Sequence, residues 1–282
     1  MTLPSSVTRV LPAGACDCHM HVFEPRFGGQ ADTPAPLASA AMYGDLQASL
    51  GLQRVVVVQA NRYVADNRGM LEAMAAFGDN ARGVVVIDPD TDEAELQRLH
   101  TLGVRGVRFH MLSGGHLQWT QLDNVAARVR PFGWHLQLQF DGWTLPEHAA
   151  RLCALPVDIV IVHLGKFISQ PPPGVDAPAF RALLGLLDAG RCWVKLSAPY
   201  ESSRVGAPGY DDVAPLARAL AASFAERCLW GSNWPHPGRN PPPSQAALLD
   251  PLFDWAGDQN AARRILVDNP QRLYDFGLPT PR

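Results

Sequence analysis

Lysine is nearly absent from this sequence of 282 residues, because Lys166 and Lys195 are the only two. The formal net charge is −3, so no excess of positive charge favours a nucleic acid or a membrane surface as the partner. No apolar run approaches the ~20 residues that a membrane-spanning helix needs. Arginine supplies the other basic side chains, and its guanidinium fork suits carboxylate recognition. We therefore expect a small-molecule partner, with no nucleic acid and no membrane.

Cysteine is scarce, and the Cys-x-x-Cys spacing is missing. The odd number of cysteines and their apolar surroundings predict buried free thiols of a cytosolic protein rather than disulfides or metal ligands. The N-terminal stretch Met1-Thr2-Leu3-Pro4-Ser5-Ser6 lacks a basic region followed by an apolar core, so we expect no signal peptide and a cytoplasmic location. The five cysteines are Cys16, Cys18, Cys153, Cys192 and Cys228.

Eight apolar, strand-like runs alternate with segments of helical spacing along the whole chain. This alternation predicts a single (β/α)8 barrel domain spanning residues 1–282. An open doubly wound sheet is the alternative, but no Gly-x-Gly-x-x-Gly follows the first strand. The predicted strands are 17–23, 54–60, 82–87, 104–110, 134–140, 158–164, 192–197 and 227–233. Helices are predicted at 37–50, 66–77, 91–102, 118–131, after 145, at 178–189, 211–224, 244–256 and 258–267.

Polar residues recur where these apolar runs end, which is where barrels of this kind carry their chemistry. His19 and His21 lie on one face of an extended first strand, because side chains alternate along a strand. Such a pair can share a metal ion or direct two donors at one substrate oxygen. The strand-end residues are His19, His21, Gln59, Asn61, Asp88, Arg108, His110, Gln137, Gln139, His163, Lys195, Ser197, Asn233, Trp234 and His236.

Each of these residues also has a purely structural interpretation. His163 could be a buried core histidine, although the His19–His21 pair favours a site role. Arg108 could form a salt bridge at the barrel rim or bind a substrate carboxylate. Lys195 is slightly more typical of a structural ion pair than of a catalytic group. Ser197 and Gln139 suit hydrogen-bond scaffolding, and His110 and His236 are equally compatible with the rim.

Three motifs resemble the amidohydrolase superfamily, and in particular the branch that contains 2-pyrone-4,6-dicarboxylate lactonase. They are Asp17-x-His19-x-His21, Val162-His163-Leu164-Gly165 and Trp230-Gly231-Ser232-Asn233-Trp234-Pro235-His236-Pro237. Val104-Arg105-Gly106-Val107-Arg108, Val194-Lys195-Leu196-Ser197 and Asn269-Pro270-x-x-Leu273-Tyr274-x-Phe276 extend the match. The resemblance implies a (β/α)8 fold and attack on the carbonyl of a carboxylated lactone. It also implies that His19, His21 and His163 polarise that carbonyl and that Arg108 binds the substrate carboxylate.

Asn233 is the main departure from this family. Many members have an aspartate here that activates water as general base. An amide can orient a water or a hydroxyl but cannot take its proton near neutral pH. His236, three residues further on, is the best substitute base that the sequence offers.

The same departure bears on metal binding. His19, His21 and His163 could hold zinc as a three-histidine site, but Asn233 stands where an anionic ligand would be expected. The resembled branch works without metal, so we expect no cofactor, with zinc as the alternative. The three imidazoles would then form a cradle of donors around the carbonyl oxygen.

Three functions remain open from the sequence. Hydrolysis of a carboxylated lactone such as 2-pyrone-4,6-dicarboxylate leads, because hydrolysis is the commoner outcome in the superfamily. The alternative is a lactone isomerase of the galactaro-1,5-lactone to 1,4-lactone type, which Asn233 favours because the substrate's own hydroxyl is the nucleophile. A non-catalytic binding protein is a remote third, since a fold does not fix a function. Asn61, Gln139, Lys195, Ser197 and Trp234 are expected to join Arg108 in binding the substrate.

Overall fold

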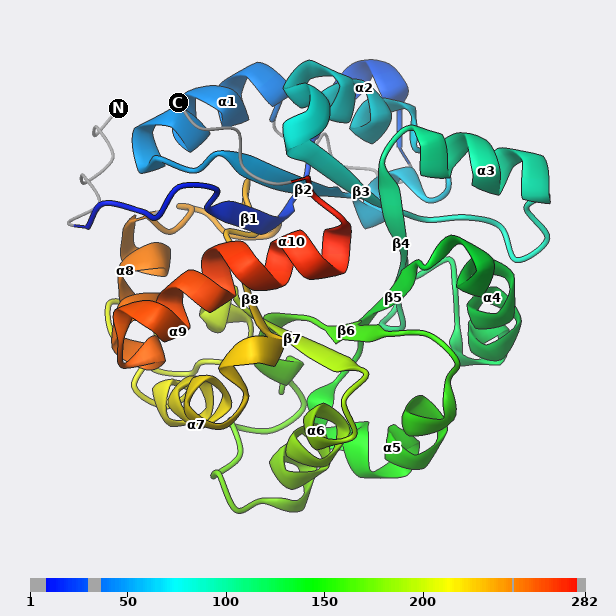
Figure 1. The fold of residues 1–282 in the computed structure, drawn as a ribbon. Coiled ribbons are helices and arrows are strands. Elements are labelled where there is room, and N and C mark those ends of the chain that lie inside the picture. Colours follow the sequence, from blue (N-terminus) through cyan, green and yellow to red (C-terminus); the bar gives the residue numbers. More distant parts are fainter. Residues whose placement is uncertain (1–8, 30–36, 245, 278–282) are drawn as a thin grey trace.

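Eight parallel strands form a nearly closed barrel, and the helices surround it (Figure 1). The computed structural model describes residues 9–29, 37–244 and 246–277. The strands follow one another around the barrel in chain order, so the predicted (β/α)8 fold is confirmed. They are β1 (Cys16–Met20), β2 (Arg54–Val58), β3 (Ala81–Val85), β4 (Val104–His110), β5 (His135–Gln139), β6 (Ile159–Ile161), β7 (Cys192–Ser197) and β8 (Cys228–Gly231).

The main helices follow the strands as the sequence pattern predicts. Leu145 begins its helix as expected, and Gly51 ends the first helix in the left-handed conformation. The helices are α1 (Ala40–Leu50), α2 (Arg68–Phe77), α3 (Glu93–Thr101), α4 (Leu122–Val129), α5 (Leu145–Ala154), α6 (Pro178–Asp188), α7 (Ala214–Phe224), α8 (Ala246–Ala256), α9 (Gln259–Arg263) and α10 (Asn269–Tyr274). Residues 30–36, between the predicted first strand and α1, lie outside the described part. Within the described residues, no helix has the length and apolar character to span a bilayer.

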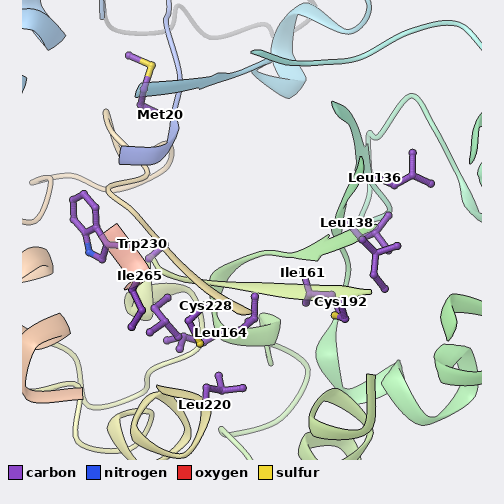
Figure 2. Packing of buried hydrophobic residues seen from close by; sticks show 14 of the residues in the cluster. Met20, Leu136, Leu138, Ile161, Leu164, Cys192, Leu220, Cys228, Trp230 and Ile265 are labelled. Carbon is purple, nitrogen blue, oxygen red and sulfur yellow. The ribbon is translucent and has the colours of Figure 1, made fainter. Parts of the chain in front are cut away.

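The β-branched runs are buried on both faces, as a parallel barrel requires. Along β2, Val55 and Val57 pack in the large cluster between barrel and helices, whereas Val56 and Val58 pack in a second cluster with residues such as Cys18. The large cluster continues around the barrel wall (Figure 2). In this view Trp230 of β8 lies near Ile265, which belongs to the helical segment Arg264–Asp268. Alternating side chains therefore fill the inside and outside of the barrel at once.

Asp17 joins the first and last strands. Its Oδ1 accepts hydrogen bonds from the backbone N–H groups of His19 and Ser232, each at 2.9 Å. Its Oδ2 accepts from the hydroxyls of Tyr43, at 2.8 Å, and of Ser232. Beyond this carboxylate the N–H of Asn233 donates to the carbonyl of His19 at 2.7 Å. The fully buried Asp17 thus fixes the closure of the barrel next to the histidine pair.

The end of the chain closes the opposite side of the barrel. Helix α10 brings Tyr274 into the interior, where its ring lies 5.2 Å from the His135 ring and 5.8 Å from Lys195 Nζ. Figure 1 shows α10 lying across the strands at this end. The sequence predicts the helix at 258–267 but not its continuation through α10.

Most of the predicted strands end earlier than their apolar runs suggest, and this matters for the site at β6 and β8. Strand β6 ends at Ile161 and β8 at Gly231, so His163 and Asn233 lie just beyond the strands, where both have positive φ. The first strand likewise ends at Met20, and the N–H of the next residue, His21, bonds to the carbonyl of Trp234. The prediction of buried free thiols is confirmed for four cysteines and wrong for Cys153, which is free but exposed on α5.

Candidate active site

A cavity of about 290 Å³ opens at the carboxyl ends of the strands. This is the end at which barrel enzymes place their active sites. Side chains from the ends of β1, β2, β4, β5, β6, β7 and β8 converge on it. The lining residues are His21, Phe23, Ala60, Asn61, Arg62, Arg108, His110, Gln139, His163, Lys166, Glu201, Asn233 and Pro237.

Eleven of the strand-end residues are predicted to act in catalysis or substrate binding. The structure places six of them at the cavity wall and five away from it. The six are His21, Asn61, Arg108, Gln139, His163 and Asn233. The five that do not line it are His19, Lys195, Ser197, Trp234 and His236. Of these five, His19 and Ser197 contact the rings of wall histidines. The N–H of His236 donates to the carbonyl of Asn233, and the carbonyl of Trp234 accepts from the N–H of His21. Trp234 also packs against the Tyr43 ring with 5.4 Å between ring centroids, while Lys195 bonds to Cys18 and Gln137 inside the barrel.

The backbone around the cavity is held in an uncommon conformation. His163, Leu164 and Lys166 after β6 have φ values of 54°, 58° and 50°, and Asn233 and His236 after β8 have 59° and 66°. A residue with a side chain adopts positive φ at a cost of order 1–3 kcal/mol unless it is Asn or Asp. Such strain is typical of functional sites, where the surrounding fold keeps side chains in directions that a relaxed chain would not choose.

The paired histidines form a hydrogen-bonded relay rather than two independent donors. The Nδ1–H of His21 donates to the carbonyl oxygen of Val58 at 2.8 Å, which leaves Nε2 of His21 without a proton. Nε2–H of His19 can then donate to it across 3.3 Å. Burial lowers the pKa of His21 to about 3 and that of His19 well below its ordinary value. Both rings are therefore neutral near pH 7, and His19 acts on the cavity through His21.

His163 is the imidazole best placed to donate into the cavity. Its Nδ1 lies 2.9 Å from Ser197 Oγ, and a proton donated by Ser197 leaves Nε2–H free for a ligand. Its ring also contacts that of His19, with 4.9 Å between centroids. Burial, together with the charge of Lys166, lowers the pKa of His163 well below its ordinary value, so this donor is neutral. The predicted scaffolding role of Ser197 fits this contact.

Arg108 is a buried cation with neutral partners. It donates to the carbonyl of Gln59 at 2.5 Å and to Oε1 of Gln139 at 2.9 Å, while its Nε has no hydrogen-bond partner. Burial lowers the pKa of Arg108 to about 10, so the group remains charged near neutrality. Within the described residues no carboxylate forms an ion pair with it. A buried charge without a counter-ion is costly, and an anionic ligand would supply what is missing.

Asn233 is oriented by a hydrogen-bonded chain behind the cavity wall. Its Nδ2 donates to the hydroxyl of Tyr200 at 2.9 Å, and that hydroxyl lies 2.8 Å from Nδ1 of His236. Burial lowers the pKa of His236 to about 4 and raises that of Tyr200, so a neutral His236 accepts the phenolic proton. The amide nitrogen is thereby committed to Tyr200, which leaves Oδ1 of Asn233 to accept a hydrogen bond from a ligand.

Lys195 does not form the structural ion pair that the sequence slightly favours. Its ammonium donates to the carbonyl of Cys18 and to Oε1 of Gln137, both neutral acceptors inside the barrel. Burial lowers the pKa of Lys195 to about 7, and its charge helps to lower that of His19. Lys195 therefore lies beneath the histidine pair and outside the cavity.

The sequence pattern did not identify the Lys166–Glu201 ion pair on the cavity wall. Lys166 Nζ lies 2.9 Å from Glu201 Oε2, with side-chain exposures of 9% and 18%. Both residues come three or more positions after their strands end, beyond the strand termini from which candidates were drawn. What could have identified them is a charged side chain in the loop just after a strand, in Leu164-Gly165-Lys166 after β6 and in Pro199-Tyr200-Glu201 after β7.

The residues that could hold a metal are poorly arranged for one. Within the described ranges, no group of three or more His, Cys, Asp or Glu side chains is placed to bind a metal ion. A metal-bound histidine usually donates its second ring N–H to a partner, yet Nδ1 of His19 is buried without one. The donor set of His19, His21 and His163 therefore does not fit a zinc centre well, and metal independence stays a prediction.

Fold and cavity together define a barrel whose polar site lies at the carboxyl ends of its strands. The amidohydrolase family model matches residues 16–276, and the chain belongs to this family. It is 37% identical over 272 residues to a D-galactarolactone isomerase of Agrobacterium fabrum, covering 93% of this chain and 91% of that protein. It is also 37% identical over 287 residues to a 2-pyrone-4,6-dicarboxylate hydrolase of Comamonas testosteroni, covering 96% and 93%. An apo crystal structure of an Agrobacterium tumefaciens protein superposes with a TM-score of 0.87 at 35% identity, over 95% of this chain and 98% of that one.

Proposed function

We propose that this protein is an enzyme that acts on the ester bond of a carboxylated lactone. The buried Arg108 carries this proposal, because its charge has neutral partners and faces a cavity of small-molecule size. A substrate carboxylate there would complete a charge-assisted, bidentate contact. The names of the two relatives, a lactone isomerase and a pyrone dicarboxylate hydrolase, support the same substrate class.

His163 would polarise the lactone carbonyl, because Nε2 of His21 carries no proton and accepts from His19. Nε2–H of the neutral His163 is aimed where the carbonyl oxygen gains negative charge during attack, with His21 beside it and His19 supporting His21. Fixed donors in a site that excludes water stabilise this charge without reorganising, which is worth several kcal/mol. This step needs no metal, and we propose a metal-independent reaction.

The orientation of Asn233 favours isomerisation over hydrolysis. A hydroxyl of the substrate attacks the ring carbonyl carbon, the bond from that carbon to the ring oxygen breaks, and the proton passes from the attacking hydroxyl to the departing oxygen. Oδ1 of Asn233 can align that hydroxyl, while the amide cannot activate water. A nucleophile already held on the substrate depends on positioning more than on a base. We therefore propose a lactone isomerase.

Hydrolysis is the second candidate, and one observation favours it. Among the described residues lining the cavity, Glu201 is the one carboxylate and could serve as base in place of the absent aspartate. His236 is less suited to that role than the sequence suggests, because its Nδ1 faces Tyr200 and it does not line the cavity.

A small-molecule substrate and free thiols agree with a cytoplasmic enzyme.

Asn233→Asp separates the two reactions. The protein is incubated with galactaro-1,5-lactone and with 2-pyrone-4,6-dicarboxylate, followed by NMR of the lactone rings and by pyrone absorbance. Wild type should interconvert five- and six-membered rings without net acid release, and the variant should gain hydrolysis by about 10²-fold or more. Asn61→Asp places the same charge elsewhere on the wall and should not gain it. Rapid pyrone opening by wild type would favour the hydrolase instead, and silence on both lactones would refute the proposed function.

A further inference from the structure

We infer that the Glu201–Lys166 pair is a specificity device that binds the hydroxylated edge of the substrate and rejects a second carboxylate. The inference rests on the proposed function, since it assigns the half of the cavity opposite the carboxylate site. It concerns which lactones are accepted rather than how the ester bond is broken.

The charges of the cavity are divided between two walls. Arg108 of β4, whose hydrogen-bond partners are neutral, gives one wall its positive charge. Lys166 and Glu201, from the loops after β6 and β7, form the other, where the two charges cancel. A substrate carboxylate is attracted to the first wall and gains nothing from the second.

Glu201 is held so that one carboxylate oxygen can meet a ligand. Its Oε2 accepts from Lys166 at 2.9 Å, whereas its Oε1 is 3.8 Å from the Arg239 guanidinium, too far for a hydrogen bond. The backbone supports this placement, because Arg239 donates to the carbonyl of Tyr200 at 2.7 Å. Oε1 therefore retains acceptor capacity at the cavity wall.

An acceptor paired with a cation suits vicinal hydroxyl groups. One hydroxyl can donate to Glu201 Oε1 while the next accepts from Lys166 Nζ, which has three protons to donate. A carboxylate in the same place meets the like charge of Glu201 at low exposure, where charges are poorly screened. The pair therefore favours a lactone with one carboxylate and several hydroxyls over a planar dicarboxylate without hydroxyls.

Equilibrium binding tests the proposed selectivity of the Glu201–Lys166 pair without requiring turnover. The probes are D-galactonate, a hydroxylated monocarboxylate, and benzene-1,3-dicarboxylate, a planar dicarboxylate, titrated by calorimetry into the full-length protein. Glu201→Gln should weaken galactonate binding about tenfold or more, because a charge-assisted hydrogen bond is lost. The same variant should tighten binding of the dicarboxylate several-fold. Opposite changes for the two probes are a result that mere loss of structure cannot produce.

Two further variants complete the test. Glu201→Asp keeps the negative charge on a shorter side chain, so it should still exclude the dicarboxylate while weakening galactonate. Glu226→Gln makes the same chemical change in the exposed turn before β8, away from the cavity, and should change neither affinity. Parallel changes for both probes in Glu201→Gln, no change for either, or equal wild-type affinity for the two would overturn the inference. A wild type that shows the binding pattern but turns over no lactone would refute the proposed function alone.

Discussion

The buried histidines should make the fold sensitive to mild acid. Five imidazoles are at most 3% exposed, and burial keeps each pKa below the ordinary value: His19, His21, His135, His163 and His236. In the unfolded chain each would titrate near about 6.5. The folded state thus binds fewer protons, so stability is fully present above about pH 6.5 and is lost as pH falls below it.

The size of the effect follows from proton linkage. At pH 5.5 each imidazole that stays neutral in the folded state costs about 1.4 kcal/mol relative to neutral pH, or about 7 kcal/mol for all five. Asp17 opposes this, because burial raises its pKa and the folded state then takes up a proton. One proton offsets at most about 2 kcal/mol over this pH interval. Lys195 has a pKa of about 7 in the folded state and is fully protonated in the unfolded chain, so it adds a loss of under about 1 kcal/mol in the same direction. A net loss of about 5 kcal/mol is comparable with the whole stability of many domains.

Urea unfolding monitored by tryptophan fluorescence at pH 7.5, 6.5 and 5.5 measures this loss. His135→Phe offers a matched test, because both nitrogens of that ring lack partners and it does not line the cavity. It should reduce the slope of stability against pH by about one proton, ~1.4 kcal/mol per pH unit. An unfolding free energy at pH 5.5 within about 1 kcal/mol of that at pH 7.5 would refute the reasoning.

Three further predictions concern the hydrogen bonds of Asp17, the charge of Arg108 and the absence of a metal requirement. Asp17→Asn should lower the unfolding free energy by about 2–3 kcal/mol, measured in urea, whereas Asp188→Asn, at an exposed position of α6, should have little effect. Equal losses would contradict the role of Asp17 in joining the first and last strands. Arg108→Lys should reduce kcat/KM for a carboxylated lactone by about 100-fold, since the bidentate fork is lost, and an unchanged value would exclude Arg108 as the carboxylate site. Exhaustive dialysis against a chelator should leave activity intact with substoichiometric zinc by elemental analysis, and activity lost on dialysis and restored by zinc would show metal dependence.

Much of the fold can be predicted from the sequence because local and tertiary requirements coincide. The run Val55–Val58 is strand-forming by residue type and buried on both faces in the barrel. The strand ends are harder, because they depend on distant partners. His21 leaves β1 where its N–H meets the carbonyl of Trp234, a contact that no local pattern encodes.

The site was only partly predictable for a similar reason. Strand-end position identifies Arg108 and His163 well, since both lie at or just past their strands. It does not distinguish a residue at the wall from one behind it, as His19 shows. Glu201 was missed because its place in the cavity depends on a loop conformation and on Lys166, which lies 35 residues away in sequence.

The hydrogen bonds from Ser232 to Asp17 have a consequence for the synthesis and folding of the chain. Ser232 lies 215 positions after Asp17, so β1 emerges from the ribosome long before the strand that covers its free edge. At 5–20 residues per second, synthesis of that interval takes roughly 10–40 s. Throughout this time the strand that carries His19 exposes unpaired backbone groups, which invite association with other chains. Expression yield and the need for chaperones should therefore depend on this edge more than on any other in the barrel.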